Sequence, residues 1–294
     1  MARKIQLNES EFKTLIGNIL NEAIYSLVES HLAVVDNIED IINWVGENWT
    51  SPDDVWWIKF DSRKKDFKNY NKRNPDKPTK WWNFQDKTDS TSKENHVGYV
   101  IVRGATKEAC QDSIKNAVVH LNPWAAKEMG TDAVYSNGNA DAIRTVCNAF
   151  FARAYITINS RSMNQTIQRA KIDKQNTVHN PFKGREFHHR VGQARTGIDG
   201  NGVNWTILRP YGLVDCDVDN PQAQAELEQY FKDNGVDIKL KKQSHDGMHY
   251  IISIDQAKGL NFNFMNKYST NNRRGDPNVL FKPDANIIVY SPIG

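Results

Sequence analysis

The sequence has few cysteines, no long apolar runs and no large excess of either charge. Its 294 residues include three cysteines, Cys110, Cys147 and Cys216, which lie far apart and form no Cys-x-x-Cys pair. Neither a zinc knuckle nor a disulfide framework is therefore expected, and a reducing compartment is the simpler interpretation. The formal net charge is only +3, which is too small a bias to indicate nucleic-acid binding from composition alone.

Membrane and export signals are also missing from the pattern. No stretch approaches the roughly 18 apolar residues that a membrane span requires. The N-terminal segment MARKIQLNESEFK contains no continuous apolar core of the kind found in signal peptides. We therefore expect no membrane partner and a cytoplasmic location, or carriage inside a particle that is made in a cell.

Hydrophobic periodicity predicts a mixed fold of class α/β (α+β) with four segments. Residues 1–48 form a helical leader, with an amphipathic helix over 4–30 and a second short helix near 38–45. Residues 49–172 form an α/β lobe, 173–204 a polar connection, and 205–294 a second lobe. In the first lobe the pattern predicts three strands, at 55–60, 97–102 and 154–158, and two helices, at 107–120 and 140–151.

A basic segment follows the first of these strands. Residues 61–80, DSRKKDFKNYNKRNPDKPTK, have the composition of an exposed, mobile loop, and pairs of tryptophans stand on either side of it. Aromatic rings beside cations suit a single-stranded nucleic acid, but the pattern favours the plainer interpretation of a solvated loop with its tryptophans in the core. The candidate nucleic-acid contacts are Arg63, Lys64 and Lys65 in this segment, and Arg153 and Arg161 beside the strand at 154–158.

Two carboxylates close the strand predicted at 211–214. Asp215 and Asp217 are two residues apart, so they project from the same face of a strand. Neighbouring carboxylates repel each other unless a cation lies between them, and Mg²⁺ or Mn²⁺ prefers such oxygen ligands. A plain structural alternative is an aspartate that caps the helix after it. Asn220 and Pro221 predict the start of that helix.

A β-hairpin is predicted after this helix. VDIKLKKQS and MHYIISI alternate as strands, and the turn between them contains Ser244, Gly247 and His249. The order strand, helix, strand, strand allows the Asp215 strand to lie beside the hairpin. His249 alone is more typical of a satisfied core histidine, so the interpretation as a site depends on its occurrence together with the two aspartates.

This arrangement resembles the catalytic half of archaeo-eukaryotic primases, the primase-polymerase superfamily. Their RRM-like β-α-β-β unit carries an Asp-x-Asp motif on the first strand and a Ser-to-Gly-x-His motif at the hairpin. The resemblance covers about residues 205–254. It implies that Asp215 and Asp217 bind the catalytic metals, and that Ser244, Gly247 and His249 contact the phosphates of a nucleoside triphosphate. The implied partners are a single-stranded template or primer and nucleoside triphosphates.

The sequence departs from the family in two places. The Ser-to-His segment is one residue shorter than the common form and has Asp246 where a second glycine is usual. The family also uses a third acid, for which Asp276 and Asp284 are candidates; Asp284 is preferred because it adjoins a predicted strand. Arg273 and Lys282 are candidate partners for phosphate.

The leader resembles short segments on proteins of Bacteroidales and crAss-like phages, through KIQLNESEFKTLIGNILNEAI. It implies an address or docking helix, an infected bacterial host, and phage replication or virion proteins as further partners. Two functions follow. One is a phage-type primase-polymerase-like nucleotidyltransferase. The other is a non-catalytic virion, cargo or nucleic-acid-binding protein with a degenerate primase-like domain.

Two rival interpretations of the aspartates remain. An EF-hand would use Asp215, Asp217, Asp219 and Glu226, but Asn220 stands where that loop needs glycine. A glycosyltransferase also uses an Asp-x-Asp motif for a metal and a nucleotide sugar, although it does not require the Ser/Gly/His hairpin.

Overall fold

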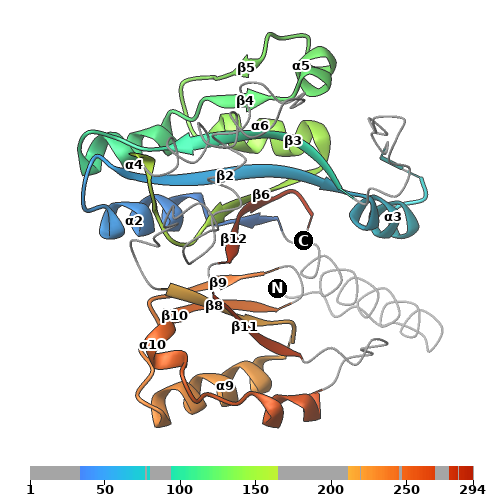
Figure 1. Ribbon diagram of the computed structural model, residues 1–294. Helices are drawn as coiled ribbons and strands as arrows, with labels where there is room; N and C mark the ends of the chain where they lie inside the picture. Colours follow the sequence, from blue (N-terminus) through green and yellow to red (C-terminus); the bar gives the residue numbers. More distant parts are fainter. Residues whose placement is uncertain are drawn as a thin grey trace, which may run out of the picture.

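The computed structural model describes residues 34–76, 78–79, 94–164, 211–218, 220–244, 247–268, 278–283 and 285–293. The predicted leader helix (4–30) and polar connection (173–204) lie outside the described residues. Two sheets dominate the described part, and every strand pairing in it is antiparallel (Figure 1). The prediction of a mixed helix-and-strand fold is confirmed, in its α+β form.

The large sheet has the strand order β1-β12-β6-β2-β3-β4-β5, with β7 paired to β2. Its strands are β1 (Val35–Asp36), β2 (Asp54–Arg63), β3 (Glu94–Val102), β4 (Val119–Leu121), β5 (Val134–Tyr135), β6 (Ala152–Thr157), β7 (Arg161–Ser162) and β12 (Asn286–Ser291). Its helices are α2 (Ile38–Asn48), α3 (Lys64–Arg73), α4 (Lys107–Lys115), α5 (Pro123–Met129) and α6 (Asp141–Phe150).

The main hydrophobic core lies between the large sheet and helices α2, α4 and α6. Alternate residues of the central strand β2, Trp56, Ile58 and Phe60, join apolar side chains of these helices in one buried cluster. Residues at the alternate positions, beginning with Trp57 and Lys59, face the other side of the sheet. On that second face, Lys59, Asp61 and Arg63 of β2 line a cavity.

The small sheet has the order β11-β8-β10-β9. Its elements are β8 (Tyr211–Cys216), α9 (Pro221–Asp233), β9 (Leu240–Gln243), β10 (Met248–Ser253), α10 (Ile254–Ala257), the 3-10 helix η1 (Asn263–Tyr268) and β11 (Val279–Pro283). Helix α9 begins as predicted, because the Asn220 side chain accepts hydrogen bonds from the backbone N–H groups of Gln222 and Ala223, and Pro221 occupies the first turn.

The faces of the small sheet have different partners. Val214 and Cys216 point into a second hydrophobic cluster with α9. Leu213 and Ile251 point the other way and extend the core of the large sheet. Helix α2 lies at this junction, where the rings of Trp44 and Tyr211 meet edge to face with centroids 5.1 Å apart. The strand, helix, strand, strand order predicted for this region is confirmed.

The segment 61–80 differs most from its prediction. The sequence predicts a mobile loop, whereas β2 continues to Arg63 and residues 64–73 form helix α3. Asp66 and Phe67 on this helix are buried, and Arg153 from β6 forms an ion pair with Asp66 at 2.7 Å. A partner 87 residues away stabilises the helix, and no local pattern reveals such a contact.

Several elements belong to other parts of the fold than the predicted segment bounds imply. Helix α2 was assigned to the leader, but its apolar side chains belong to the main core. β12 was assigned to the second lobe, but it pairs with β1 and β6 in the large sheet. The helix predicted to reach residue 120 ends at Lys115, and β4 follows it. Within the described residues, no helix is long and apolar enough to span a membrane.

Candidate active site

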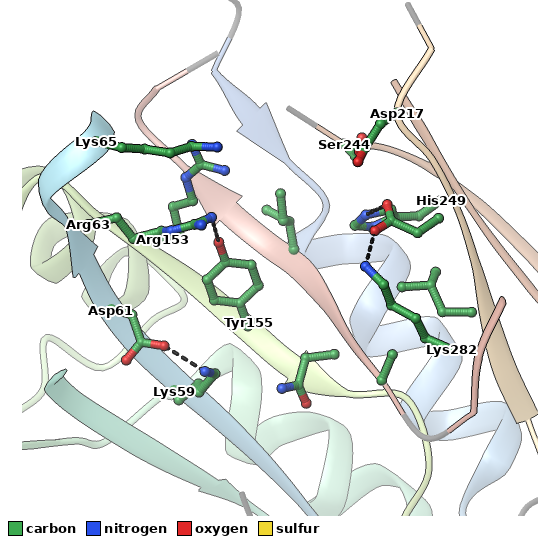
Figure 2. A pocket seen from close by; sticks show the side chains of 15 residues that line it. Lys59, Asp61, Arg63, Lys65, Arg153, Tyr155, Asp217, Ser244, His249 and Lys282 are labelled. Atoms are coloured by element: carbon green, nitrogen blue, oxygen red, sulfur yellow. Dashed lines mark hydrogen bonds and ion pairs between the residues drawn. The ribbon is translucent and has the colours of Figure 1, made fainter. Parts of the chain in front are cut away.

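A cavity of about 420 Å³ lies between the two sheets, and each sheet contributes one wall (Figure 2). The large sheet presents its polar face here, and the small sheet presents the face that carries the Asp-x-Asp motif. The lining residues are Lys59, Asp61, Arg63, Lys65, Arg153, Tyr155, Leu213, Asp215, Asp217, Ser244, His249, Lys282, Ala285, Asn286 and Ile288.

Asp215 lies at the centre of the small-sheet wall, on the middle strand β8. His249 is directly opposite it on β10, and the His249 Nε2 atom lies 3.1 Å from the Asp215 Oδ1 atom. On the other side, Lys282 of β11 reaches the Asp215 Oδ2 atom. Both oxygens of this carboxylate therefore have a cationic or hydrogen-bonding partner in the structure.

These partners hold Asp215 in its ionised form. Burial alone raises the pKa of the Asp215 carboxyl, but the hydrogen bond from His249 and the charges of His249 and Lys282 outweigh this effect and lower the pKa to about 2. The side chain is 12% exposed. A carboxylate that stays charged near the cavity floor is suited to binding a cation that enters from solvent.

Asp217 lines the same cavity just beyond the end of β8. Its backbone N–H donates to the Asn278 carbonyl at 2.9 Å, which continues the pairing with the β11 side. The prediction that Asp215 and Asp217 share one face is confirmed. Two carboxylates are a sufficient protein contribution for Mg²⁺ or Mn²⁺, because these ions commonly keep waters and phosphate oxygens as their other ligands.

Asp215 and Asp217 therefore offer the oxygen ligands that a divalent ion prefers, but they are only two ligands. Among the described residues, no group of three or more His, Cys, Asp or Glu side chains is placed to hold a metal. A bound ion would need ligands from elsewhere, and the Asp215 Oδ2 atom now contacts Lys282. The ion and Lys282 compete for the same oxygen.

Ser244 and His249 add buried polar atoms to the same wall. They are 5% and 8% exposed. The Ser244 Oγ and His249 Nδ1 atoms have no hydrogen-bond partner within the described part of the chain. A buried polar atom without a partner destabilises the fold. Both atoms are closed off from solvent, so a ligand in the cavity could reach them only after this wall moved.

Gly247 has a structural role in this wall. A Cβ atom at this position would lie 2.0 Å from the Cys216 carbonyl oxygen and 2.8 Å from the Val218 nitrogen. Only glycine lets the turn between β9 and β10 pack this closely on the end of the strand that carries the aspartates. The Gly247 carbonyl also accepts from the Ser244 N–H at 3.0 Å. Gly247 does not itself line the cavity.

The large-sheet wall carries most of the positive charge. Lys59 and Arg63 come from β2 and Arg153 from β6, while Lys65 lies in the first turn of α3. Figure 2 places these four side chains across the cavity from Asp217, Ser244 and His249. The Lys59 Nζ atom also lies 5.6 Å from the ring centroid of Tyr155.

Asp61 is the acid in this wall, and its charge is locally balanced. It contacts Lys59 at 2.7 Å and His96 at 3.1 Å. Burial raises the pKa of the Asp61 carboxyl, but the hydrogen bond with His96 and the nearby Lys59 charge outweigh this effect, and the net pKa is lowered. The wall as a whole therefore presents an excess of cations to an anionic ligand.

The structure brings together most of the candidates that were predicted from sequence. Eight of them line the cavity: Asp215, Asp217, Ser244, His249, Lys282, Arg63, Lys65 and Arg153. Lys64 is exposed on α3 and is not a lining residue. Arg161 is buried and donates to the carbonyls of Asn159 and Ser160, so it does not face this cavity. Asp276, Asp284 and Arg273 lie outside the described residues.

Four polar lining residues were missed from sequence: Lys59, Asp61, Tyr155 and Asn286. All four lie in strands, next to apolar residues that face the core. A period-2 pattern along Trp56, Ile58 and Phe60 implies that Lys59 and Asp61 face the other side. The strand predicted from sequence ends at residue 60, so the pattern was not continued to Asp61.

Comparisons of the chain with protein-family models, curated proteins and solved structures gave no match.

Proposed function

We propose that this protein is a metal-dependent nucleotidyltransferase of the primase-polymerase type, which uses nucleoside triphosphates on a nucleic-acid template. One observation carries the proposal: Asp215, Asp217, Ser244 and His249 line one cavity, opposite a cationic wall from a second sheet. The order β11-β8-β10-β9 puts the first strand of the small sheet between the third and the fourth, which supports an RRM-like unit.

Each wall then has a distinct task. Asp215 and Asp217 would hold Mg²⁺ or Mn²⁺, which when bound stabilises the negative charge that develops on the transferring phosphoryl group. Ser244 and His249, which line the same wall, would contact the phosphate oxygens, as the family resemblance implies. Lys59, Arg63 and Lys65 would neutralise the remaining phosphate charge from across the cavity. Lys282 would leave Asp215 and contact phosphate instead.

A primer-extension assay with Mg²⁺ or Mn²⁺ tests the proposal. The purified protein should incorporate nucleotides, and the double variant Asp215→Asn with Asp217→Asn should reduce incorporation to background. Asp112→Asn with Asp255→Asn is a matched control, because both residues sit in exposed ion pairs on α4 and α10. Equal incorporation by the parent and the Asp215/Asp217 double variant would end the assignment.

A second candidate is a non-catalytic nucleotide-binding or nucleic-acid-binding protein, carried in a virion as cargo. The contact between Lys282 and Asp215 favours it, because a permanent lysine at this oxygen would exclude the metal. Calorimetry separates the two functions. Triphosphate binding without turnover, at any Mg²⁺ or Mn²⁺ concentration, supports the second candidate. If residues 1–30 act as an address, their deletion alters assembly and leaves catalysis in vitro unchanged.

A further inference from the structure

Helix α3 presents an almost purely cationic surface. Lys64, Lys65, Lys68, Lys72 and Arg73 are all exposed, and none of them has an ion-pair partner within the described residues. The chain as a whole has a formal net charge of only +3. The five cations on this ten-residue helix are therefore a local cluster of positive charge in a chain that is close to neutral overall.

The single acid of α3 is turned away from this surface. Asp66 is 2% exposed and pairs with Arg153. The helix is also fixed by aromatic contacts, because the rings of Phe67 and Tyr70 meet Phe151 edge to face at 5.0 and 4.8 Å. Phe151 itself adopts a left-handed conformation with φ of 49°, which is uncommon for a residue with a side chain. The cations therefore stand on a helix that an ion pair and aromatic packing attach to the rest of the protein.

The basic surface is continuous with the cavity. Arg63 directly precedes the helix and Lys65 lies in its first turn, and both line the cavity (Figure 2). Lys64, Lys68 and Lys72 follow at intervals of four residues, so they form a row along one side of the helix. With a rise of 1.5 Å per residue, this row is about 12 Å long. That length matches three to four nucleotides of a stacked strand at 3.4 Å each.

We propose that α3 binds the phosphate backbone of a single-stranded nucleic acid and guides it into the cavity. The inference rests on the proposed function only in that the bound strand is the template or primer. Phosphates are the complementary partner, because a row of unpaired lysines gains binding free energy from every counterion that it releases from the strand. Specificity for base sequence is not expected from this helix, since it offers charge and no base-reading groups beyond asparagines.

The test is the salt dependence of binding to a fluorescent single-stranded oligonucleotide, measured by anisotropy without metal or nucleotide. The triple variant Lys64→Gln, Lys68→Gln, Lys72→Gln should bind more weakly. The slope of log K against log salt should fall by about 2, since each phosphate contact on a single strand contributes about 0.7. The loss should be equal for oligonucleotides of unrelated sequence. A triple Lys→Arg variant at the same positions should restore the slope.

A matched control removes the same charge elsewhere. Lys107, Lys115 and Lys127 are exposed on α4 and α5, so their triple glutamine variant should leave the slope unchanged. The inference is overturned if both triple variants lower the slope equally, or if the α3 variant does not lower it. A protein that binds through α3 but never extends a primer would retain this inference and lose the proposed function, so the two failures are distinguishable.

Discussion

Two ion pairs at the cavity differ in how far solvent can reach them. On the large-sheet side, Asp66 is paired with Arg153, and the two side chains are 1% and 4% exposed. On the small-sheet side, Asp215 is paired with Lys282, which is 46% exposed. The first pair has no access to a replacement partner, whereas the second can exchange its lysine for a cation from solvent. The Asp66 pair is therefore built to keep its counter-charge, and the Asp215 pair can give it up.

Arg153→Met should produce the largest effect. The substitution leaves Asp66 as a buried charge without its partner, which typically costs about 3–5 kcal/mol. Urea denaturation should show this loss in the free energy of unfolding. Arg144→Met is the control, because Arg144 is 32% exposed and pairs with Asp36 and Asp141 on the surface, where loss of a pair costs at most about 1 kcal/mol. Similar losses in the two variants would contradict the buried character of the Arg153–Asp66 pair.

Gly247→Ala tests how the small-sheet wall is held. The added Cβ would overlap the Cys216 carbonyl, and displacing backbone in a packed region costs about 3 kcal/mol. Gly235→Ala is the control: Gly235 also lies outside regular structure, with φ of 66° and open space around it, so only backbone strain of about 1 kcal/mol is expected. Thermal and urea unfolding of both variants measure the difference. An equally small loss at Gly247 would contradict the tight turn.

Asp61→Asn should have a smaller effect that depends on pH. The folded-state pKa of Asp61 is lowered, so its ionised form stabilises the fold above the unfolded value of about 3.9. This contribution is lost as the pH falls toward the lowered folded pKa. At pH 7 the variant should lose about 1.5 kcal/mol, the typical value for a hydrogen bond to a charged group.

The parent and the Asp61→Asn variant should then converge in the free energy of unfolding as the pH is lowered from 6 to 3. Urea titrations at several pH values measure this convergence. Asp237→Asn, which removes an exposed partner of Lys239, is the control, and its loss at pH 7 should stay below about 1 kcal/mol. A constant difference between the parent and Asp61→Asn across this range would contradict the pKa assignment.

Lys282→Met should change stability least, by less than about 1 kcal/mol, because the lysine is half exposed. It should nevertheless tighten Mn²⁺ binding to the free protein, since the ion no longer competes with an ammonium group for Asp215. Electron paramagnetic resonance of free Mn²⁺ measures the affinity. Lys258→Met, at an exposed pair with Asp255, is the control. Unchanged Mn²⁺ affinity in Lys282→Met would mean that this wall does not exchange its counter-charge.

The small-sheet wall was largely predictable from sequence because its determinants are local. Asp215 and Asp217 share a face by their spacing of two, and Asn220 and Pro221 define the next helix within a few residues. His249 could be placed beside them because a strand, a helix and a hairpin in that order allow few arrangements. Gly247 was assigned to the correct turn, although its role is packing against the Cys216 carbonyl.

The large-sheet wall was not predictable in the same way. Its geometry depends on contacts between distant segments: Arg153 with Asp66, and Phe151 with Phe67 and Tyr70. Without these partners, a segment as basic as 61–80 has the composition of a loop. The position of β12 likewise depends on pairing with β6, some 130 residues earlier in the chain, and hydrophobic alternation does not specify a pairing partner.

The crossing from β11 to β12 has a consequence for how the molecule can be divided. Only two residues separate Pro283 in the small sheet from Asn286 in the large one, and β12 lies between β1 and β6. A fragment that ends before residue 286 would lack β12, so β1 and β6 would lose the strand that lies between them. A fragment that starts at residue 205 would contain β12 without either of these two neighbouring strands. The large sheet is therefore complete only when β12 is present, and no single cut in the chain separates the two sheets.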